Sequence, residues 1–291
     1  MSSGARVAAA FSKRIPAIGE VLSPSLSAAL EGKTLMITGA SSGIGRAGAL
    51  KIGAAGGKAL LVARTREKLE EVAEEIAALG GVAFVHPCDL SDLEDIDRMV
   101  AEVLQQHGGV DILVNNAGRS IRRSVKRSHD RFHDFERTMQ LNYFGAVRLV
   151  LGVLPGMRER GTGHIINIST MGLQTNTPRF SAYLASKAAM DAFSRSIAAE
   201  IIEDGVHITT IYMPLVRTPM IAPTKMYDRF PALSPDEAAN LIAEAIRRRP
   251  KRISTTLGGL ASLSYSAMPG AQDLAMSRAV RAIGAASPSN D

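Results

Sequence analysis

The sequence predicts an α/β protein: a single doubly wound parallel sheet with helices on both faces. Three observations lead to this prediction. From Lys33 onward, short apolar runs alternate with helical patterns, as in parallel sheets whose strands are joined by crossover helices. Residues 34–50 (TLMITGASSGIGRAGAL) place an apolar run, a glycine-rich turn and a helix start in immediate succession. No internal repeat or linker interrupts the pattern, so we expect one domain.

The glycine-rich turn is the first candidate site. Gly39, Gly43 and Gly45 are spaced so that the backbone can turn tightly and leave its N–H groups uncovered. A helix that begins there adds about half a unit of positive charge. The corner therefore suits a pyrophosphate, although a tight surface turn would have a similar pattern. The candidate cofactor-binding residues of the corner are Gly39, Ser41, Ser42, Gly43, Ile44 and Gly45.

The remaining elements follow in order along the chain. After the first strand, Leu35–Ile37, further strands are expected at residues 59–63, 82–85, 112–114, 164–168 and 208–212, with an edge strand at 254–256. Helices are expected at residues 67–79, 93–106, 132–157, 183–202 and 235–248, and Ser91 is expected to introduce the second of them. Five prolines punctuate residues 214–235, which we interpret as a substrate loop.

The two ends of the chain are expected to lie outside the domain, which we assign to residues 31–257. Residues 1–30 are rich in Ala and Ser and are interrupted by prolines, so we expect a frayed leader, with a short interfacial helix as the alternative. Residues 258–291 are expected to form an apolar tail with a disordered-looking end.

Composition limits the classes of function. With 46% apolar residues and no apolar run near the roughly 20 residues of a membrane span, the sequence describes an ordinary globule. A single cysteine, Cys88, excludes an internal disulfide and a structural metal site built on cysteines. The net charge of +6 favours anionic partners, but 4% aromatic residues and no nucleic-acid motif make nucleic acid the weakest candidate.

The end of the second strand bears on the choice of cofactor. An acidic residue at this position would bind the free 2′-hydroxyl of an adenosine ribose. The chain has Ala63 and Arg64 instead, so a 2′-phosphate would meet positive charge and NADPH is favoured. The third and fourth strands end at further short polar or small residues, placed to contact the cofactor: Asp89, Leu90, Asn116, Ala117 and Gly118.

The expected helix at 183–202 begins with a phenol and an ammonium group. Tyr183 and Lys187 are four residues apart and so share one face of the helix. Because free tyrosine has a pKa of about 10, we expect the charge of Lys187 to make Tyr183 a usable acid near neutral pH.

Three other polar residues are candidates for the same chemistry. Ser169 and Thr170 follow the expected strand 164–168 and offer hydroxyl groups to a substrate carbonyl. Successive strand residues face opposite ways, so only one of the two is expected to point at the substrate. Asn142 is a candidate amide on the expected helix 132–157, where a packing role is equally compatible with the sequence.

Taken together, these motifs resemble the short-chain dehydrogenase/reductase family. The resemblance extends from about residue 31 to 252 and is carried by TGASSGIG (38–45), NNAG (115–118), Asn142, the hydroxyl pair 169–170 and the YxxxK pattern of 183–187. It implies a Rossmann-type sheet of about seven strands and a nicotinamide cofactor.

The resemblance also implies roles for individual residues. Asn142 would support a proton relay, Tyr183 would be the general acid, and Lys187 would hold the nicotinamide ribose and polarise the phenol. The family's usual serine position is occupied by Thr170, which we expect to keep the oxyanion role, with Ser169 as the alternative. The loop that grips the carboxamide corresponds to Pro214, Val216 and Thr218.

Four further stretches resemble the bacterial short-chain fatty acyl-CoA reductases that form fatty aldehydes: residues 117–123, 130–151, 178–189 and 211–225. They lie on the substrate side. The likeness implies NADPH-dependent reduction of a long-chain acyl-CoA, with Tyr183 as the acid. Reduction of a 3-oxo-acyl chain, a long-chain aldehyde or another bulky lipid-like carbonyl is the alternative, and a non-catalytic dinucleotide-binding module is a third class.

The expected partners follow from this interpretation. The acyl group would arrive on CoA or on acyl carrier protein, both anionic, and residues 119–137 carry seven basic and three acidic side chains that could meet them, unless they form a solvated face. We expect a cytoplasmic homo-oligomer, with peripheral membrane contact through the N-terminal segment left open.

Overall fold

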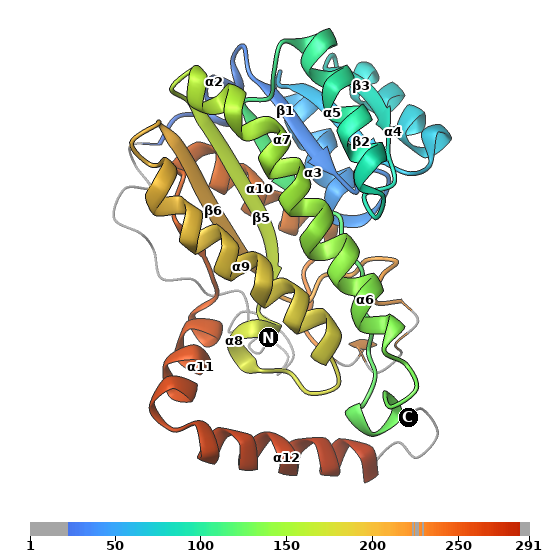
Figure 1. The fold of residues 1–291 in the computed structure, drawn as a ribbon, viewed down its shortest axis with the longest axis vertical. Helices are drawn as coiled ribbons and strands as arrows, with labels where there is room; N and C mark the ends of the chain where they lie inside the picture. Colours follow the sequence, from blue (N-terminus) through green and yellow to red (C-terminus); the bar gives the residue numbers. More distant parts are fainter. Residues whose placement is uncertain (1–22, 223, 225–226, 229, 286–291) are drawn as a thin grey trace, which may run out of the picture.

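The computed structural model describes residues 23–222, 224, 227–228 and 230–285, and its centre is a parallel sheet of seven strands in the order β3-β2-β1-β4-β5-β6-β7 (Figure 1). The chain forms the sheet outward in two directions from β1, which confirms the doubly wound prediction. The strands are β1 (Thr34–Thr38), β2 (Lys58–Ala63), β3 (Val82–Pro87), β4 (Ile112–Asn115), β5 (Gly163–Thr170), β6 (Val206–Met213) and β7 (Arg252–Ile253).

Helices cover both faces of the sheet. One group packs on one face, where Ile52, Leu69 and Ile246 belong to a single buried cluster: α3 (Gly43–Ala54), α4 (Arg66–Ala78) and α10 (Pro235–Arg248). A second group packs on the opposite face: α5 (Leu93–His107), α7 (Ala146–Glu159) and α9 (Ser181–Ile201). Because both faces are covered, the central strands are apolar throughout rather than alternating, and Leu35, Met36 and Ile37 are all fully buried.

The ends of the helices follow local capping chemistry, with one correction to the sequence prediction. Asp92, not Ser91, caps α5: its carboxylate accepts hydrogen bonds from the backbone N–H groups of Glu94 and Asp95. The backbone N–H of Ser91 instead donates to the side chain of Asp89. Both residues are good caps by type, so the sequence alone could not choose between them.

The predicted helix at 132–157 is also corrected, because the structure divides it. Helix α6 (His133–Met139) leads into a π-helical segment, Gln140–Gly145, and only then into α7. At Gly145 this chain passes so close to Leu90 that a Cβ atom would lie 2.1 Å from the Leu90 carbonyl oxygen. Such bulges are often found at functional sites, and this one contains Asn142.

Three further boundaries differ from the prediction. Strand β5 extends through Thr170, so the two candidate hydroxyl residues belong to the strand itself. The edge strand is Arg252–Ile253 rather than 254–256. The predicted tail is helical as far as it is described: α11 (Thr256–Ala267) and α12 (Pro269–Ala285) follow the sheet, and Thr255 caps α11. The predicted disordered-looking end, residues 286–291, lies outside the described residues.

At the N-terminal end, the predicted leader lies outside the described residues up to position 22. The remainder contains a short helix, α2 (Leu26–Leu30), capped by Ser25. The guanidinium of Arg247 on α10 donates to the carbonyl of Pro24, which ties the segment before α2 to α10. Among the described residues, no helix is long and apolar enough to cross a membrane.

Candidate active site

A cavity of about 540 Å³ lies beyond the carboxyl ends of β1, β4, β5 and β6. It brings together most of the residues predicted from the sequence: Gly39, Ser42, Gly43, Ile44, Asn116, Ala117, Gly118, Thr170, Tyr183, Lys187, Pro214, Val216 and Thr218. The remaining predicted residues do not line it: Ser41, Gly45, Arg64, Asp89, Leu90 and Asn142. Ligands of doubly wound sheets bind at this edge.

The glycine corner has the geometry that a dinucleotide needs. Gly39 and Gly43 have positive φ angles of 66° and 55°, where a side chain would be strained. A Cβ atom on Gly45 would lie 2.2 Å from the carbonyl oxygen of Gly39, so only glycine lets α3 approach β1 this closely. Ser42 makes no side-chain cap on α3, and the first turn has no acidic residue. The N–H groups of this turn are therefore available to an anion.

Asn116 holds the other side of the corner in place. Its amide donates a 2.8 Å hydrogen bond to the carbonyl of Thr38 at the end of β1. The hydroxyl of Thr38 in turn accepts from the backbone N–H groups of Asn116 and Ala117, each at 2.9 Å. These bonds fix the β4 loop against the glycine turn, so the NNAG sequence shapes the site as well as lining it.

Residues expected near the adenosine end lie outside the cavity. Arg64 is exposed at the end of β2, and the next basic residue, Arg66, lies 3.7 Å from Glu70. Asp89 bonds its own loop through the N–H of Ser91, and Leu90 is buried beneath Gly145.

Lys187 is buried at the base of the cavity. Its ammonium donates a 2.7 Å hydrogen bond to the carbonyl oxygen of Ile168 in β5. Burial lowers the pKa of Lys187 to about 8, since the charged form loses its water. The group is still mostly a cation at neutral pH.

Tyr183 behaves differently from the expectation. Burial raises the pKa of Tyr183 to about 12, and a hydrogen bond with Thr170 acts in the opposite direction. Burial therefore dominates the pKa of this phenol in the protein alone. Tyr183 is therefore fully protonated at neutral pH, which is the form that can donate a proton.

Asn142 connects two segments that border the cavity, helix α9 and the loop after β4. Its side-chain amide donates 2.9 Å hydrogen bonds to Ser186 Oγ and to the carbonyl of Arg119, and its oxygen accepts from the N–H of Arg119. It thus joins the π-helical segment to α9 beside Lys187 and to the loop after β4. The packing role left open by the sequence is present.

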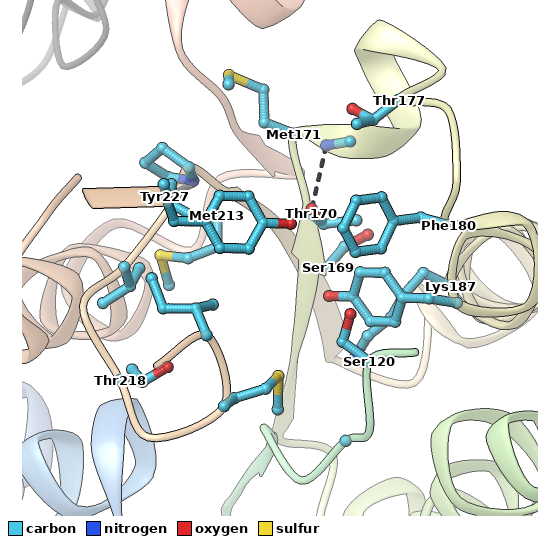
Figure 2. A pocket seen from close by; sticks show the side chains of 18 of the residues that line it. Ser120, Ser169, Thr170, Met171, Thr177, Phe180, Lys187, Met213, Thr218 and Tyr227 are labelled. Atoms are coloured by element: carbon cyan, nitrogen blue, oxygen red, sulfur yellow. Dashed lines mark hydrogen bonds between the residues drawn. The ribbon is translucent and has the colours of Figure 1, made fainter. Parts of the chain in front are cut away.

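Ser169 and Thr170 both line the cavity, although we expected only one to face it. The hydroxyl of Thr170 accepts a 3.0 Å hydrogen bond from the N–H of Gly172, drawn as a dashed line in Figure 2. Ser169 is 6% exposed and its Oγ has no hydrogen-bond partner among the described atoms. A buried hydroxyl in that state has bonding capacity left for a ligand.

Several lining residues were not predicted from the sequence. Figure 2 shows Tyr227 of the substrate loop across the cavity from Phe180 and Lys187, with its hydroxyl pointing toward Thr170. Arg179 also lines the cavity, as do Met276 and Ala279 of α12. Tyr227 is the one tyrosine in the proline-punctuated loop, a signal that was present in the sequence. No motif in the sequence around Met276 and Ala279 indicates that these residues line the cavity.

Three of the seven basic residues of segment 119–137 surround one buried carboxylate. The carboxylate of Asp134 is 2% exposed and collects three arginines. The nitrogen-to-oxygen distances from this carboxylate to the guanidinium groups are 2.8 Å for Arg123, 2.7 Å for Arg137 and 3.7 Å for Arg131. Arg122 is the basic residue of this segment that lines the cavity.

Comparison with known proteins places this geometry in a family. The family model described as short chain dehydrogenase matches residues 33–227. A fatty acyl-CoA reductase of Acinetobacter baylyi is 59% identical over 248 residues, which cover 85% of this chain and 84% of that protein.

Two solved structures have the same fold. A short-chain dehydrogenase from Streptomyces avermitilis aligns with a TM-score of 0.72 and 30% identity, over 86% of this chain and 97% of that one. A metagenomic short-chain oxidoreductase in complex with NADP aligns with a TM-score of 0.66 and 31% identity, over 76% and 92%. This chain is an oxidoreductase that belongs to the short-chain dehydrogenase/reductase family.

Proposed function

We propose that this protein reduces long-chain fatty acyl-CoA thioesters to fatty aldehydes with NADPH. The observation that carries the proposal is the cavity, in which Thr170, Tyr183 and Lys187 face a wall of apolar side chains. That wall includes Leu184, Met213, Leu215, Met220, Ile221 and Phe230. The similarity to the Acinetobacter baylyi reductase supports the same substrate class.

The residues present fit a nicotinamide dinucleotide. The uncapped first turn of α3 and the three glycines would hold its pyrophosphate, and Arg64 would attract a 2′-phosphate. NADPH, when bound, supplies a hydride to the carbonyl carbon of the substrate.

The protein's own residues handle the carbonyl oxygen and the proton. The hydroxyls of Thr170 and Tyr183 donate to the oxygen as negative charge develops on it. Tyr183 then gives up its proton, and the nearby cation of Lys187 stabilises the phenolate that remains. Asn142 keeps α9 and the β4 loop in register for this transfer.

Aldehyde forms when the reduced thioester loses its thiol, so that the C–S bond breaks and the sulfur leaves with a proton. No covalent acyl-enzyme is required. The only cysteine, Cys88, is buried on the β3 side of the sheet, and burial raises the pKa of its thiol to about 12. A thiol in this state is a poor nucleophile.

The carrier of the acyl group would meet positive charge at the cavity. Arg122 follows the β4 loop and Arg179 precedes α9, and both line the cavity that the thioester would enter. Arg179 has a positive φ of 72°, an uncommon conformation for a residue other than glycine, and its carbonyl accepts a 2.7 Å hydrogen bond from the N–H of Arg123. CoA phosphates and acyl carrier proteins are both anionic, so either carrier fits this charge.

A single assay tests the proposal. Purified protein is incubated with NADPH and palmitoyl-CoA, and NADPH absorbance and free thiol are followed together. We expect equal molar amounts of NADPH consumed and thiol released. NADPH consumption on a long-chain aldehyde or 3-oxo-acyl substrate, with no thiol released from palmitoyl-CoA, would replace the proposal with the reduction of a lipid-like ketone or aldehyde.

A further inference from the structure

Helix α11 presents an unusual apolar face to solvent. Leu257, Leu260 and Leu263 are 40%, 60% and 70% exposed, and their spacing of three residues puts them on one side of the helix. The helix has no charged residue. Its opposite side packs on α8 (Gly172–Thr175), where Gly258 is buried against the side chain of Gln174.

Helix α12 continues this apolar face toward the cavity. Met268, between the two helices, is 61% exposed, and Leu274 is 50% exposed. Leu274 shares one side of α12 with Arg278 and Arg281, at spacings of four and seven residues, and both arginines are exposed. Met276, on the other side, lines the cavity. One helix therefore separates the cavity from solvent and carries leucine and arginine outside it.

The segment after β4, which also lines the cavity, likewise carries exposed apolar side chains and basic residues. The segment that supplies Ser120 and Arg122 to the cavity continues into Val125 and Phe132, which are 67% and 69% exposed. Lys126 and Arg127 lie between them in sequence. Residues 125–132 and 256–285 together contain five arginines and lysines and two aspartates. Figure 1 shows α12 running along one end of the molecule toward the start of α6.

We propose that this end of the protein, formed by α11, α12 and residues 125–132, docks on an anionic lipid surface, so that α12, a wall of the cavity, lies against the membrane. Exposed leucines and phenylalanine would enter the boundary between headgroups and acyl chains, while the arginines and lysines pair with lipid phosphates. A protein partner would require a single complementary surface, whereas lipid tolerates apolar side chains spread over two separate flanks. The link to catalysis rests on the proposed function, because a long acyl chain is itself a membrane component.

Tryptophan fluorescence can test the docking directly, since the chain has no tryptophan. Leu263→Trp places a single reporter on α11, and Leu79→Trp places a matched one at the end of α4, where Leu79 is 57% exposed. Vesicles of mixed phosphatidylcholine and phosphatidylglycerol should shift the Leu263→Trp emission to shorter wavelength and leave the Leu79→Trp emission unchanged. Equal behaviour of the two reporters would overturn the proposal.

Sedimentation with the same vesicles measures the energetics. Leu260→Ser/Leu263→Ser should reduce partitioning at least about tenfold, as expected for two leucines leaving a lipid environment. The control Leu79→Ser/Val82→Ser, which removes two exposed apolar side chains at another site, should have no effect. Arg278→Gln/Arg281→Gln should weaken binding to anionic vesicles and not to phosphatidylcholine alone. Undiminished binding by the leucine variant would assign the contact to another part of the chain and refute the proposal.

Light scattering separates lipid from a second copy of the protein. If Leu260→Ser/Leu263→Ser changes the oligomeric state while vesicle binding is unaltered, the face is a subunit interface and the proposal is wrong. Vesicle binding requires no turnover, so it can succeed when the thioester assay fails, and the two proposals are tested separately.

Discussion

The ammonium of Lys187 donates its 2.7 Å hydrogen bond to the carbonyl oxygen of Ile168, which ties α9 to the end of β5. Because Ile168 precedes Ser169 and Thr170, this one bond sets the distance between the cation and both hydroxyl-bearing residues. It also keeps a charge in a site that is otherwise shielded from water.

This burial predicts a pH limit on activity. The pKa of Lys187 is lowered to about 8, so its charge is present below that pH and lost above it. If the cation stabilises the Tyr183 phenolate, kcat/KM should fall about tenfold per pH unit above pH ~8. A profile of kcat/KM against pH checks this. A flat profile to about pH 10 would contradict a role for the charge of Lys187.

The same burial predicts that Lys187 lowers the stability of the fold. The folded-state pKa lies below the usual lysine value of 10.5, so the unfolded chain binds more protons between pH 8 and 10.5. Stability should therefore rise with pH in that window. At pH 7, Lys187→Met should raise the Tm by about 2–4 °C while activity is lost. Thermal unfolding at neutral pH and at about pH 10 measures this, and the gain should shrink at the higher pH.

Ser169 and Thr170 should respond differently to loss of the hydroxyl. Thr170→Val should reduce kcat/KM on the order of a hundredfold and Thr170→Ser should retain activity, as expected for an oxyanion donor. Ser169→Ala should reduce kcat/KM by about tenfold or less, and it should raise stability by about 1 kcal/mol, because its buried hydroxyl lacks a partner. Steady-state kinetics and thermal unfolding of all three variants decide. If Ser169→Ala is the crippling change, the oxyanion role belongs to Ser169.

Arg64 should determine the choice of cofactor. We expect kcat/KM to be higher with NADPH than with NADH, and Arg64→Asp should reduce the ratio by about tenfold or more, the loss of a hydrogen bond to a charged group. Lys68→Asp makes the same change of charge at an exposed position of α4 and serves as the control. Wild-type protein with equal efficiency on the two cofactors would show that this arginine does not read the phosphate.

Arg122 and Arg123 should have separable roles. Arg122→Ser should raise the KM for palmitoyl-CoA and leave the KM for a free fatty aldehyde nearly unchanged, since only the former carries phosphates. The effect should diminish in salt as the Debye length falls from about 10 Å at 0.1 M to 3 Å at 1 M. Arg123→Ser should instead lower stability by about 1–3 kcal/mol, because Asp134 loses its 2.8 Å partner. An equal rise in KM on both substrates for Arg122→Ser would show that Arg122 does not contact the acyl carrier.

The strands and the glycine corner could be predicted from the sequence because local chemistry determines them. Leu35–Ile37 is apolar on both faces, and Gly39, Gly43 and Gly45 are required where no side chain fits. The Tyr183 and Lys187 pair was likewise visible, since helical spacing alone puts the two side chains on one face. Features that depend only on residues close together in the sequence can therefore be predicted from it.

What the sequence could not supply depends on contacts between distant segments. The π-helical turn around Asn142 arises where Gly145 meets Leu90, and no local pattern of residues 132–157 indicates it. The raised pKa of Tyr183 depends on burial by surrounding elements, which overrides the charge of a neighbour four residues away. The helical form of residues 256–285 was missed because their glycines and small residues resemble those of a loose tail.

The position of α11 and α12 after the last strand has a consequence for biosynthesis. Domains fold from the N-terminus as the chain is made, and every strand of the sheet is synthesised before α11 and α12. The glycine corner and the Tyr183 and Lys187 pair can therefore assemble while the wall formed by Met276 and Ala279 is still missing. A nascent chain would acquire its cofactor corner first and close its substrate cavity last, so a truncated translation product would be folded yet open.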